Sequence, residues 1–390
     1  MEPLKSRFLL DPDVVFLNHG SFGACPRPVF DEYQRWQREL EREPVEFLGR
    51  RANGLLREAR AALAAFLGAA PDDVVYYANP TTAVNMVARS LALEAGDEVL
   101  TTDHEYGAMD RAWRFACGKT HARYVRRSVA LPLTTAEDFV EDFWAGVTER
   151  TRVIFISHLT SPTALIFPVE AICRRARAAG ILTVIDGAHG PGQLPLRLAE
   201  LGADIYIGAC HKWLMAPKGA GFLYARPEVQ ARLEPLVVSW GWQSDTPGPS
   251  PFIDCHEWQG TRDLAAYLSV PAAIHFQAEH GWEQVRAACH ALASEARTRL
   301  DALTGLEPLC PDSPAWFGQM AAVRLPPVDG VALQARLYAD YRIEVPMVRW
   351  QEADFVRVSF QGYNTPADLE SLLAAMAVLL PEAQRAEVAR

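Results

Sequence analysis

The sequence predicts an α/β fold, with a large domain built on a mostly parallel sheet flanked by helices and a smaller α+β domain after it. From about residue 73 onward, short runs rich in β-branched residues alternate with stretches of helical periodicity. This alternation is typical of parallel strands with helices on both faces. A Pro/Gly-rich patch at 246–251 ends the alternation, and long amphipathic helices with a few short strands follow it.

The expected elements begin with a helical region before the sheet, at residues 28–67, which are strongly charged. Strands of the large sheet are predicted at Val74–Ala78, Glu98–Thr102, Val153–Ser157, Ile181–Ile185, Asp204–Gly208 and Gly221–Ala225. Helices between them are predicted at Thr82–Leu93, Thr134–Val147 and Val169–Ala179. After the patch, helices are predicted at Trp282–Leu303 and Gly330–Tyr341, and strands at Met320–Leu325, Arg342–Pro346 and Phe355–Phe360.

Composition narrows the class of protein. The chain has 390 residues, 49% of them hydrophobic, which allows a sizeable core, and its net charge of −10 argues against nucleic-acid or anionic-membrane partners. Seven cysteines are scattered without a CxxC pair, which favours free thiols in a reducing cytosol. The first residues show no signal-peptide pattern, and the late apolar run 372–380 is too short to span a bilayer. We therefore expect a cytoplasmic protein.

Two predicted strands lead into residues of opposite charge. Asp186 closes the strand at 181–185, and Lys212 follows the strand at 204–208. Ligands of such sheets bind beyond the carboxyl ends of the strands, so both side chains are expected in one site. Pyridoxal 5′-phosphate (PLP) requires such a pair, because the lysine forms the Schiff base and the acid keeps the pyridine nitrogen protonated. The plainer alternatives are a solvated loop lysine and an aspartate that caps a helix.

Further segments offer contacts to such a cofactor. His189 lies where it can stack on the ring or bond its phenolic oxygen, although a lone histidine beside a glycine turn is more often a surface residue. In the 103–107 segment, His104 or Tyr106 is expected to stack on the ring, and the Tyr106 hydroxyl offers a second proton carrier. A strand-to-helix turn at 79–83 forms a good phosphate cup. The phosphate candidates are Thr81, Thr82, Ala83, His211 and Thr261.

Arg357 lies within a C-terminal apolar strand. A half-buried arginine requires a carboxylate, which is either that of a substrate or that of a structural Asp or Glu. Other templates fail: no P-loop, dinucleotide fingerprint, Gly-x-Ser-x-Gly elbow or His-Glu-x-x-His is present. We therefore predict no metal.

Taken together, these segments resemble the class V aminotransferase family of fold-type I PLP-dependent enzymes over most of the chain. The segments that carry the resemblance are Asn18–Gly23, Asn79–Ala83, Asp103–Gly107, Ser157-His158, Asp186–His189, His211-Lys212, Gly260–Arg262 and Arg357. Within the family, residues 17–23, 104–107 and 259–263 are most similar to the isopenicillin N epimerase-like branch.

The resemblance implies a large PLP domain over residues 15–255, a small domain over residues 256–390 together with 1–14, and a homodimer with active sites at the interface. It also implies roles for individual residues. These are Lys212 as Schiff base, Asp186 on the pyridine nitrogen, His189 or Ser161 near the phenolic oxygen, Thr81, Thr82 and His211 on the phosphate, Thr261 reaching the phosphate from the other subunit, and Arg357, Asn18 and His19 near the substrate.

One departure from the family pattern is informative. Cysteine desulfurases of this family carry a reactive cysteine shortly before the C-terminal arginine, and residues 338–356 contain none. Ser161 also stands in a segment where many relatives have asparagine. We therefore expect a PLP enzyme acting at the Cα of an amino acid, as an epimerase or racemase. The alternatives are a C–S lyase working by β-elimination, an aminotransferase, and a PLP-fold protein that binds a ligand without turnover.

Overall fold

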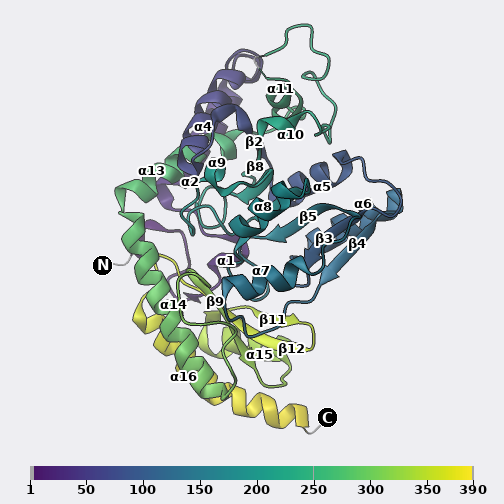
Figure 1. Cartoon of the computed structure of the whole chain (residues 1–390). Helices are drawn as coiled ribbons and strands as arrows, with labels where there is room; N and C mark the ends of the chain where they lie inside the picture. The colour runs from purple at the N-terminus through teal and green to yellow at the C-terminus, as the bar shows by residue number, and fades with distance from the viewer. Residues whose placement is uncertain (1–3, 249, 389–390) are drawn as a thin grey trace.

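The computed structural model describes residues 4–248 and 250–388, with side chains up to residue 384. Residues 1–3, 249 and 389–390 lie outside the described residues, together with the parts of the predicted small domain and of the 246–251 patch that fall on them. Figure 1 shows the sheet of the large domain in the centre, with the C-terminal elements packed below it. The boundaries of the two domains stay a prediction.

The main sheet has seven strands among the described residues, in the order β2-β8-β7-β6-β5-β3-β4. From β7 to β4 all neighbours are parallel, and β8 is the one strand of this sheet that runs opposite to the others, antiparallel to β2 and β7. The mostly parallel sheet predicted from the sequence is therefore confirmed. The bounds are β2 Val74–Tyr77, β3 Glu98–Thr102, β4 Arg123–Arg127, β5 Thr151–Ser157, β6 Leu182–Gly187, β7 Ile205–Ala209 and β8 Gly221–Ala225.

Strand β4 was not predicted from the sequence. Its segment reads Arg-Tyr-Val-Arg-Arg, and it pairs with β3 only, at the edge of the sheet. An edge strand keeps one side open to water and therefore tolerates charged side chains that an inner strand would not. Strand β6 also extends two residues beyond its predicted end, so Asp186 lies within the strand and not after it.

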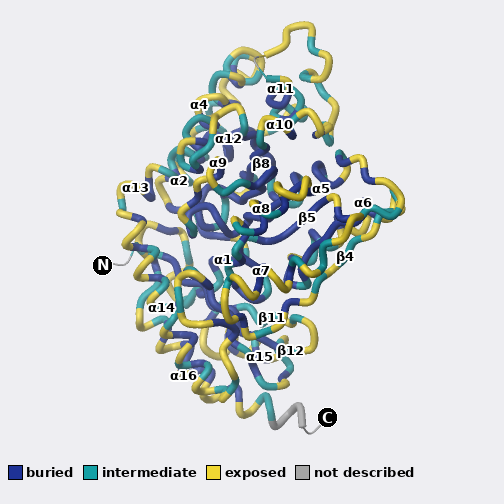
Figure 2. The backbone as a smooth tube through the Cα atoms, viewed as in Figure 1, coloured by how far each residue is buried: buried dark blue, intermediate teal, exposed yellow. Residues whose placement is uncertain are grey.

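Two hydrophobic clusters cover the two faces of the sheet, and Figure 2 shows the buried strands between them. Helices α5 (Pro80–Ser90) and α6 (Gly107–Thr120) pack on one face, whereas α4 (Ala52–Leu67), α7 (Ala136–Trp144) and α8 (Val169–Ala178) pack on the other. Side chains of a strand alternate between faces. Asp186 therefore shares the α5 and α6 face with Val184, while Ile185 points to the opposite face.

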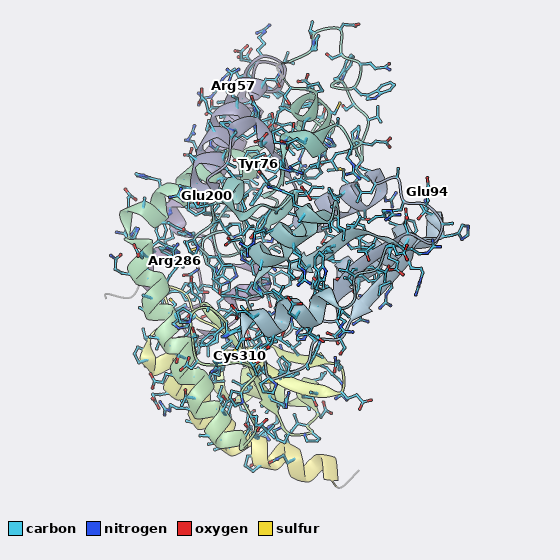
Figure 3. All side chains as sticks on the ribbon, viewed as in Figure 1. Arg57, Tyr76, Glu94, Glu200, Arg286 and Cys310 are labelled. Carbon is cyan, nitrogen blue, oxygen red and sulfur yellow. The ribbon has the colours of Figure 1, made fainter. Side chains whose placement is uncertain are left out.

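The remaining elements connect or cap these layers. In Figure 3 the labelled Tyr76 lies inside the upper part of the molecule, and its ring stacks on that of Tyr267 at a centroid distance of 4.8 Å. The other elements that precede the C-terminal part in the sequence are η1 Leu4–Arg7, α1 His19–Phe22, α2 Arg27–Arg42, α3 Pro44–Glu46, η2 Phe47–Arg51, η3 Pro71–Asp73, α9 Leu198–Leu201, α10 Pro227–Gln230, α11 Pro251–Glu257, α12 Ala265–Leu268 and α13 Val270–Glu279.

The C-terminal part is an antiparallel sheet with long helices beside it. Strands β9 (Met320–Leu325), β12 (Ala353–Ser359) and β11 (Met347–Trp350) form the sheet, with β12 in the middle. Helices α14 (Trp282–Thr304) and α16 (Pro366–Val388) lie side by side along it (Figure 1), and α15 (Gly330–Tyr341) packs on α16.

One strand predicted for this sheet belongs elsewhere. The segment 342–346 contains β10 (Ile343–Glu344), which pairs in parallel with β1 (Val15–Phe16) near the other end of the chain. The third strand of the C-terminal sheet is instead β11, which was not predicted. Because β1 leads directly to α1, this pairing fixes the 18–23 segment beside β12, where Asn18 bridges to Ser359. No helix in the described residues is long and apolar enough to cross a membrane.

Candidate active site

A cavity of about 120 Å³ lies beyond the carboxyl ends of the main strands. Segments far apart in the sequence meet there, including the residues before α5, the start of α6 and the loops after β5, β6 and β7. Of the residues that the sequence predicts for the site, those in its lining are Thr81, Tyr106, Ser161, Asp186, His189, His211 and Lys212.

Lys212 follows the end of β7 by three residues, and it is half-buried where it lines the cavity. Burial, with the nearby charge of Arg357 second, lowers the pKa of the Lys212 amine to about 8, while Asp186 acts in the opposite direction. An amine with this pKa is partly neutral at pH 7 and can act as a nucleophile or a base. Its Nζ lies 3.1 Å from Nε2 of His189.

Asp186 is paired in register with Ser157 of the neighbouring strand β5. Its Oδ1 accepts a hydrogen bond from the backbone N–H of Ala188 at 2.9 Å. Burial raises the pKa of the Asp186 carboxyl, because a carboxylate inside the protein loses its hydration. A cationic ring nitrogen at the cavity would stabilise the ionised form, so this carboxyl fits the pyridine end of PLP.

Arg357 is a buried cation that forms no ion pair with a described carboxylate. Its Nη1 donates to the carbonyl of Ser161 at 2.5 Å, and its Nη2 donates to the Ser21 hydroxyl at 3.0 Å. Its Nε has no hydrogen-bond partner among the described residues. Burial lowers the pKa of Arg357 to about 10. A buried charge without a counter-ion is costly, so this geometry fits an anionic group of a ligand.

At the start of α5, only part of the predicted phosphate cup faces the cavity. Thr81 lines it, but the N–H and the hydroxyl of Thr82 both donate to the Asn79 side chain, and the N–H of Ala83 bonds the Asn79 carbonyl. The Asn79 side chain thereby caps the helix. The donors of Thr82 and Ala83 are thus engaged at the start of the helix, and their contact to a phosphate stays a prediction. His211 Nδ1 donates to the Ala220 carbonyl at 3.1 Å, which leaves Nε2 for a ligand.

Of the two candidates for ring stacking, the structure places only Tyr106 in the cavity lining. The His104 ring is fully buried elsewhere, with its centroid 4.1 Å from that of Trp350 and its Nδ1 2.7 Å from the Thr163 hydroxyl. Aromatic packing and this hydrogen bond hold it away from the cavity. The prediction that His104 contacts the cofactor is therefore corrected, whereas Tyr106 is half-exposed beside the site.

Asn18 and His19 were predicted to bind substrate, but their polar atoms are used inside the protein. Asn18 donates to Glu344 at 2.9 Å and accepts from Ser21 at 2.5 Å. His19 is fully buried, with Nδ1 2.9 Å from the Tyr363 hydroxyl and Nε2 3.0 Å from the Lys212 carbonyl. His19 therefore holds the backbone of Lys212 in place, and Asn18 links Ser21 to Glu344. Neither residue lines the cavity, which corrects their assignment.

Thr261 lies in the wall of a second, larger cavity of about 640 Å³ between α4, α11 and the 239–248 loop. It does not line the cavity of its own chain that contains Lys212. This separation agrees with a phosphate contact supplied to another subunit, but that contact stays a prediction.

Sequence reasoning missed several residues of the site. Ser21, Phe22, Met109 and Leu159 line the cavity, and they come from the short helix α1, the start of α6 and the loop after β5, which no periodicity marks. Behind the lining, Glu105 accepts hydrogen bonds from the hydroxyls of Ser157 at 2.5 Å and Thr102 at 2.7 Å. Burial raises the pKa of the Glu105 carboxyl to about 8; the nearby Asp186 acts in the same direction, and the hydrogen bonds act against it.

The free energy of unfolding of a Glu105→Gln variant should depend less on pH than that of the wild type. The unfolded acid titrates near 4.5 and the folded acid near 8, so wild-type stability falls as pH rises between these values, because the unfolded chain releases this proton while the folded protein still holds it. The slope from one group is at most about 1.4 kcal/mol per pH unit. Chemical denaturation between pH 5 and about 8 measures it. Equal slopes in both proteins would show that Glu105 is ionised throughout this range.

Comparison with known proteins identifies the family. The family model "Aminotransferase class-V" matches residues 25–372. The chain belongs to the class-V aminotransferase family. This confirms the resemblance inferred from the sequence, and it establishes that the protein is a PLP-dependent enzyme. The Lys212 amine and the buried Asp186 carboxyl in the cavity lining, with Arg357 directly behind it, fit that cofactor and an amino acid.

Similar members of the class-V aminotransferase family differ in their reactions. The chain is 41% identical to an isopenicillin N epimerase of Amycolatopsis lactamdurans, over 95% of this chain and 96% of that protein. It is 39% identical to the isopenicillin N epimerase of Streptomyces clavuligerus, over 98% of each chain. It is 30% identical to a putative L-cysteine desulfhydrase of Oryza sativa subsp. japonica, over 95% of this chain and 84% of that protein.

Solved structures confirm the fold. The C-DES protein with glycine covalently linked to its PLP cofactor superposes with a TM-score of 0.85 and 22% identity, covering 96% of this chain and 99% of that chain. The cysteine desulfurase CsdA of Escherichia coli gives a TM-score of 0.80 and 22% identity, covering 97% of this chain and 98% of that chain. At these identities the likeness establishes the fold-type I architecture alone.

Proposed function

We propose that this protein is an epimerase or racemase that inverts the Cα of an amino acid. The observation that carries the proposal is its full-length likeness to two isopenicillin N epimerases. The residues that such a reaction needs lie in one cavity or directly behind it. Lys212 and Asp186 line it, and Arg357 bonds the lining residues Ser161 and Ser21. The side chain of the substrate amino acid is left open.

Each residue has a defined part in this proposal. PLP, when bound, supplies an electron sink that weakens the Cα–H bond. Asp186 holds the proton on the ring nitrogen, and Arg357 binds the substrate carboxylate. The Lys212 amine takes the Cα proton on its own face of the cavity. Inversion needs a proton returned to the opposite face, and we assign this to the hydroxyl of Tyr106.

Hydrogen exchange in D₂O tests the reaction type. Wild-type protein should incorporate deuterium at Cα of both enantiomers of its substrate and interconvert them. A Tyr106→Phe variant should still exchange deuterium in one enantiomer but should invert at least about 10²-fold more slowly, because it lacks the second proton carrier. Label that enters only one enantiomer in the wild type, without inversion, would remove the epimerase proposal.

An Arg357→Lys variant should bind substrate more weakly. Lysine keeps the charge but loses the planar fork that grips a carboxylate through two hydrogen bonds. We expect KM to rise about 10- to 100-fold, with a smaller change in kcat. The matched control is Arg349→Lys, because Arg349 lies on the neighbouring strand β11 and pairs with Asp354 away from the cavity. Unchanged KM in Arg357→Lys would show that this arginine is structural.

A C–S lyase is the second candidate. It is favoured by the likeness to the L-cysteine desulfhydrases. Both reactions begin with loss of the Cα proton, and they differ in whether a leaving group at Cβ departs. Release of pyruvate and ammonia from L-cysteine or its conjugates, measured beside the D₂O exchange, would establish the lyase instead.

We also propose that the protein works as a homodimer. Trp240 and Trp242 are exposed by 86% and 50% near the cavity that holds Thr261, so a partner surface is available there. Mixing inactive Lys212→Ala chains with weakened Thr261→Ala chains should restore activity if one chain completes the site of the other. A monomeric mass by sedimentation together with no restored activity would contradict the proposal.

A further inference from the structure

Two neighbouring residues contact opposite sides of one imidazole ring. Trp213 Nε1 donates to His189 Nδ1 at 3.0 Å, and Lys212 Nζ lies 3.1 Å from His189 Nε2. The Trp213 side chain is fully buried, and its carbonyl accepts a hydrogen bond from the Gln277 side chain at 2.9 Å. The His189 carbonyl accepts one from Gln193 at 3.0 Å. The ring and the indole are therefore both held in place by the protein.

The chemistry of the indole decides where the imidazole carries its proton. An indole nitrogen can only donate a hydrogen bond, so His189 Nδ1 must accept with its lone pair. A neutral imidazole has one N–H, which then lies on Nε2. Burial, with the charge of Lys212 second, holds the pKa of His189 well below its usual range, so the doubly protonated ring does not compete. The Nε2–H therefore faces the Lys212 amine.

We propose that Trp213 is a positioning residue that holds His189 in the Nε2–H tautomer, so that the ring presents a proton and not a lone pair to the Lys212 amine. A neutral amine accepts this hydrogen bond, whereas an ammonium group has no lone pair to offer. The contact therefore favours the nucleophilic form of Lys212. This inference rests on the proposed role of Lys212 as the residue that holds the cofactor.

The other charged groups around Lys212 also affect its pKa, and the Trp213→Phe substitution leaves them unchanged. Burial and the charge of Arg357 lower the pKa of the Lys212 amine, and the Asp186 carboxyl raises it. The groups that face it are Asp186 on β6, His189 after β6, Arg357 on β12 and the adjacent His211. A Trp213→Phe substitution changes none of these charges. A change in the titration of Lys212 would therefore report on the His189 ring.

The tautomer can be read directly by NMR of the full-length protein with ¹⁵N-labelled histidines, before and after addition of PLP. The His189 signal is assigned by its absence from a His189→Gln variant. We expect the wild type to carry the proton on Nε2, and the Trp213→Phe variant to shift the proton wholly or partly to Nδ1. A wild-type ring protonated on Nδ1, or a variant that stays fully on Nε2, would overturn the proposal.

The consequence for Lys212 is tested by the pH dependence of its reaction with PLP, followed by absorbance. In Trp213→Phe the Nε2 lone pair becomes free to accept from an ammonium group, so the midpoint should rise by about one pH unit. Capture of PLP at pH 7 should then slow by about tenfold. The same substitution in a His189→Gln background should cause no further shift. An unchanged midpoint in the single variant would overturn the proposal.

Trp113→Phe is the matched control. Trp113 is also fully buried, but its indole N–H has no hydrogen-bond partner among the described residues. The Trp113→Phe substitution should leave the midpoint of the pH dependence of PLP capture unchanged. If Trp213→Phe does not fold, replacing Trp213 by its sulfur isostere benzothienylalanine removes the N–H alone. If neither the wild type nor any variant captured PLP, the proposed function would be contradicted. The NMR signal of the wild type would still decide the tautomer of His189.

Discussion

A Lys212→Ala variant is expected to lose at least about 10³-fold in turnover, because the substitution removes both the amine that binds PLP and the base for the Cα proton. The fold should survive, since the hydrogen bond to His189 is the one that the Lys212 side chain makes among the described residues. Added methylamine should restore part of the activity by entering the space of the lost side chain. Steady-state rates with and without methylamine measure this.

The control for this variant is Lys218→Ala. Lys218 lies in the same loop region and donates to the carbonyl of Gly23 at 2.9 Å, but it does not line the cavity. Its loss should change the turnover by far less than the loss of Lys212. A Lys212→Ala protein that keeps most of its turnover would mean that another group performs the chemistry.

An Asp186→Asn variant is expected to separate stability from activity. An amide keeps the shape of the side chain but cannot hold a proton on the ring nitrogen, so kcat should fall about 10²- to 10³-fold. Burial raises the pKa of the Asp186 carboxyl, so its ionised form destabilises the cofactor-free protein at pH 7. Without PLP, the variant should therefore unfold at the same or a higher denaturant concentration than the wild type.

For Asp204→Asn we expect the opposite result, which is a loss of stability without a loss of activity. Asp204 is buried next to β7 as well, but it accepts from Thr183 at 2.8 Å and pairs with Arg226 at 2.6 Å. Its substitution should lower stability and leave kcat of the folded protein nearly unchanged. A loss of stability and activity together in Asp186→Asn would indicate a structural role for that carboxyl.

Local patterns of the sequence predicted the parallel sheet and the residues at its strand ends. The inner strands are apolar and β-branched because helices cover both faces, and this pattern is readable without tertiary information. Asp186 and Lys212 could be placed in one site for the same reason. The edge strand β4 escaped prediction because its alternation is weak and three of its five residues are arginine.

Contacts that depend on the orientation of single side chains could not be predicted. His104 and Tyr106 are two residues apart in one loop, and packing against Trp350 turns one away from the cavity that the other lines. Thr82 was correctly placed at a helix start, but Asn79 competes for its donors. The hydrogen bond between Trp213 and His189 joins two loops, and only the folded sheet brings them together.

Reduction of the PLP-loaded protein with borohydride, followed by peptide mapping, tests the covalent attachment on which everything else depends. The cofactor should be found on the peptide that contains Lys212, and the same treatment of Lys212→Ala should leave no labelled peptide. Label on any other lysine, or no label on wild-type protein that has been saturated with PLP, would contradict the proposed active site.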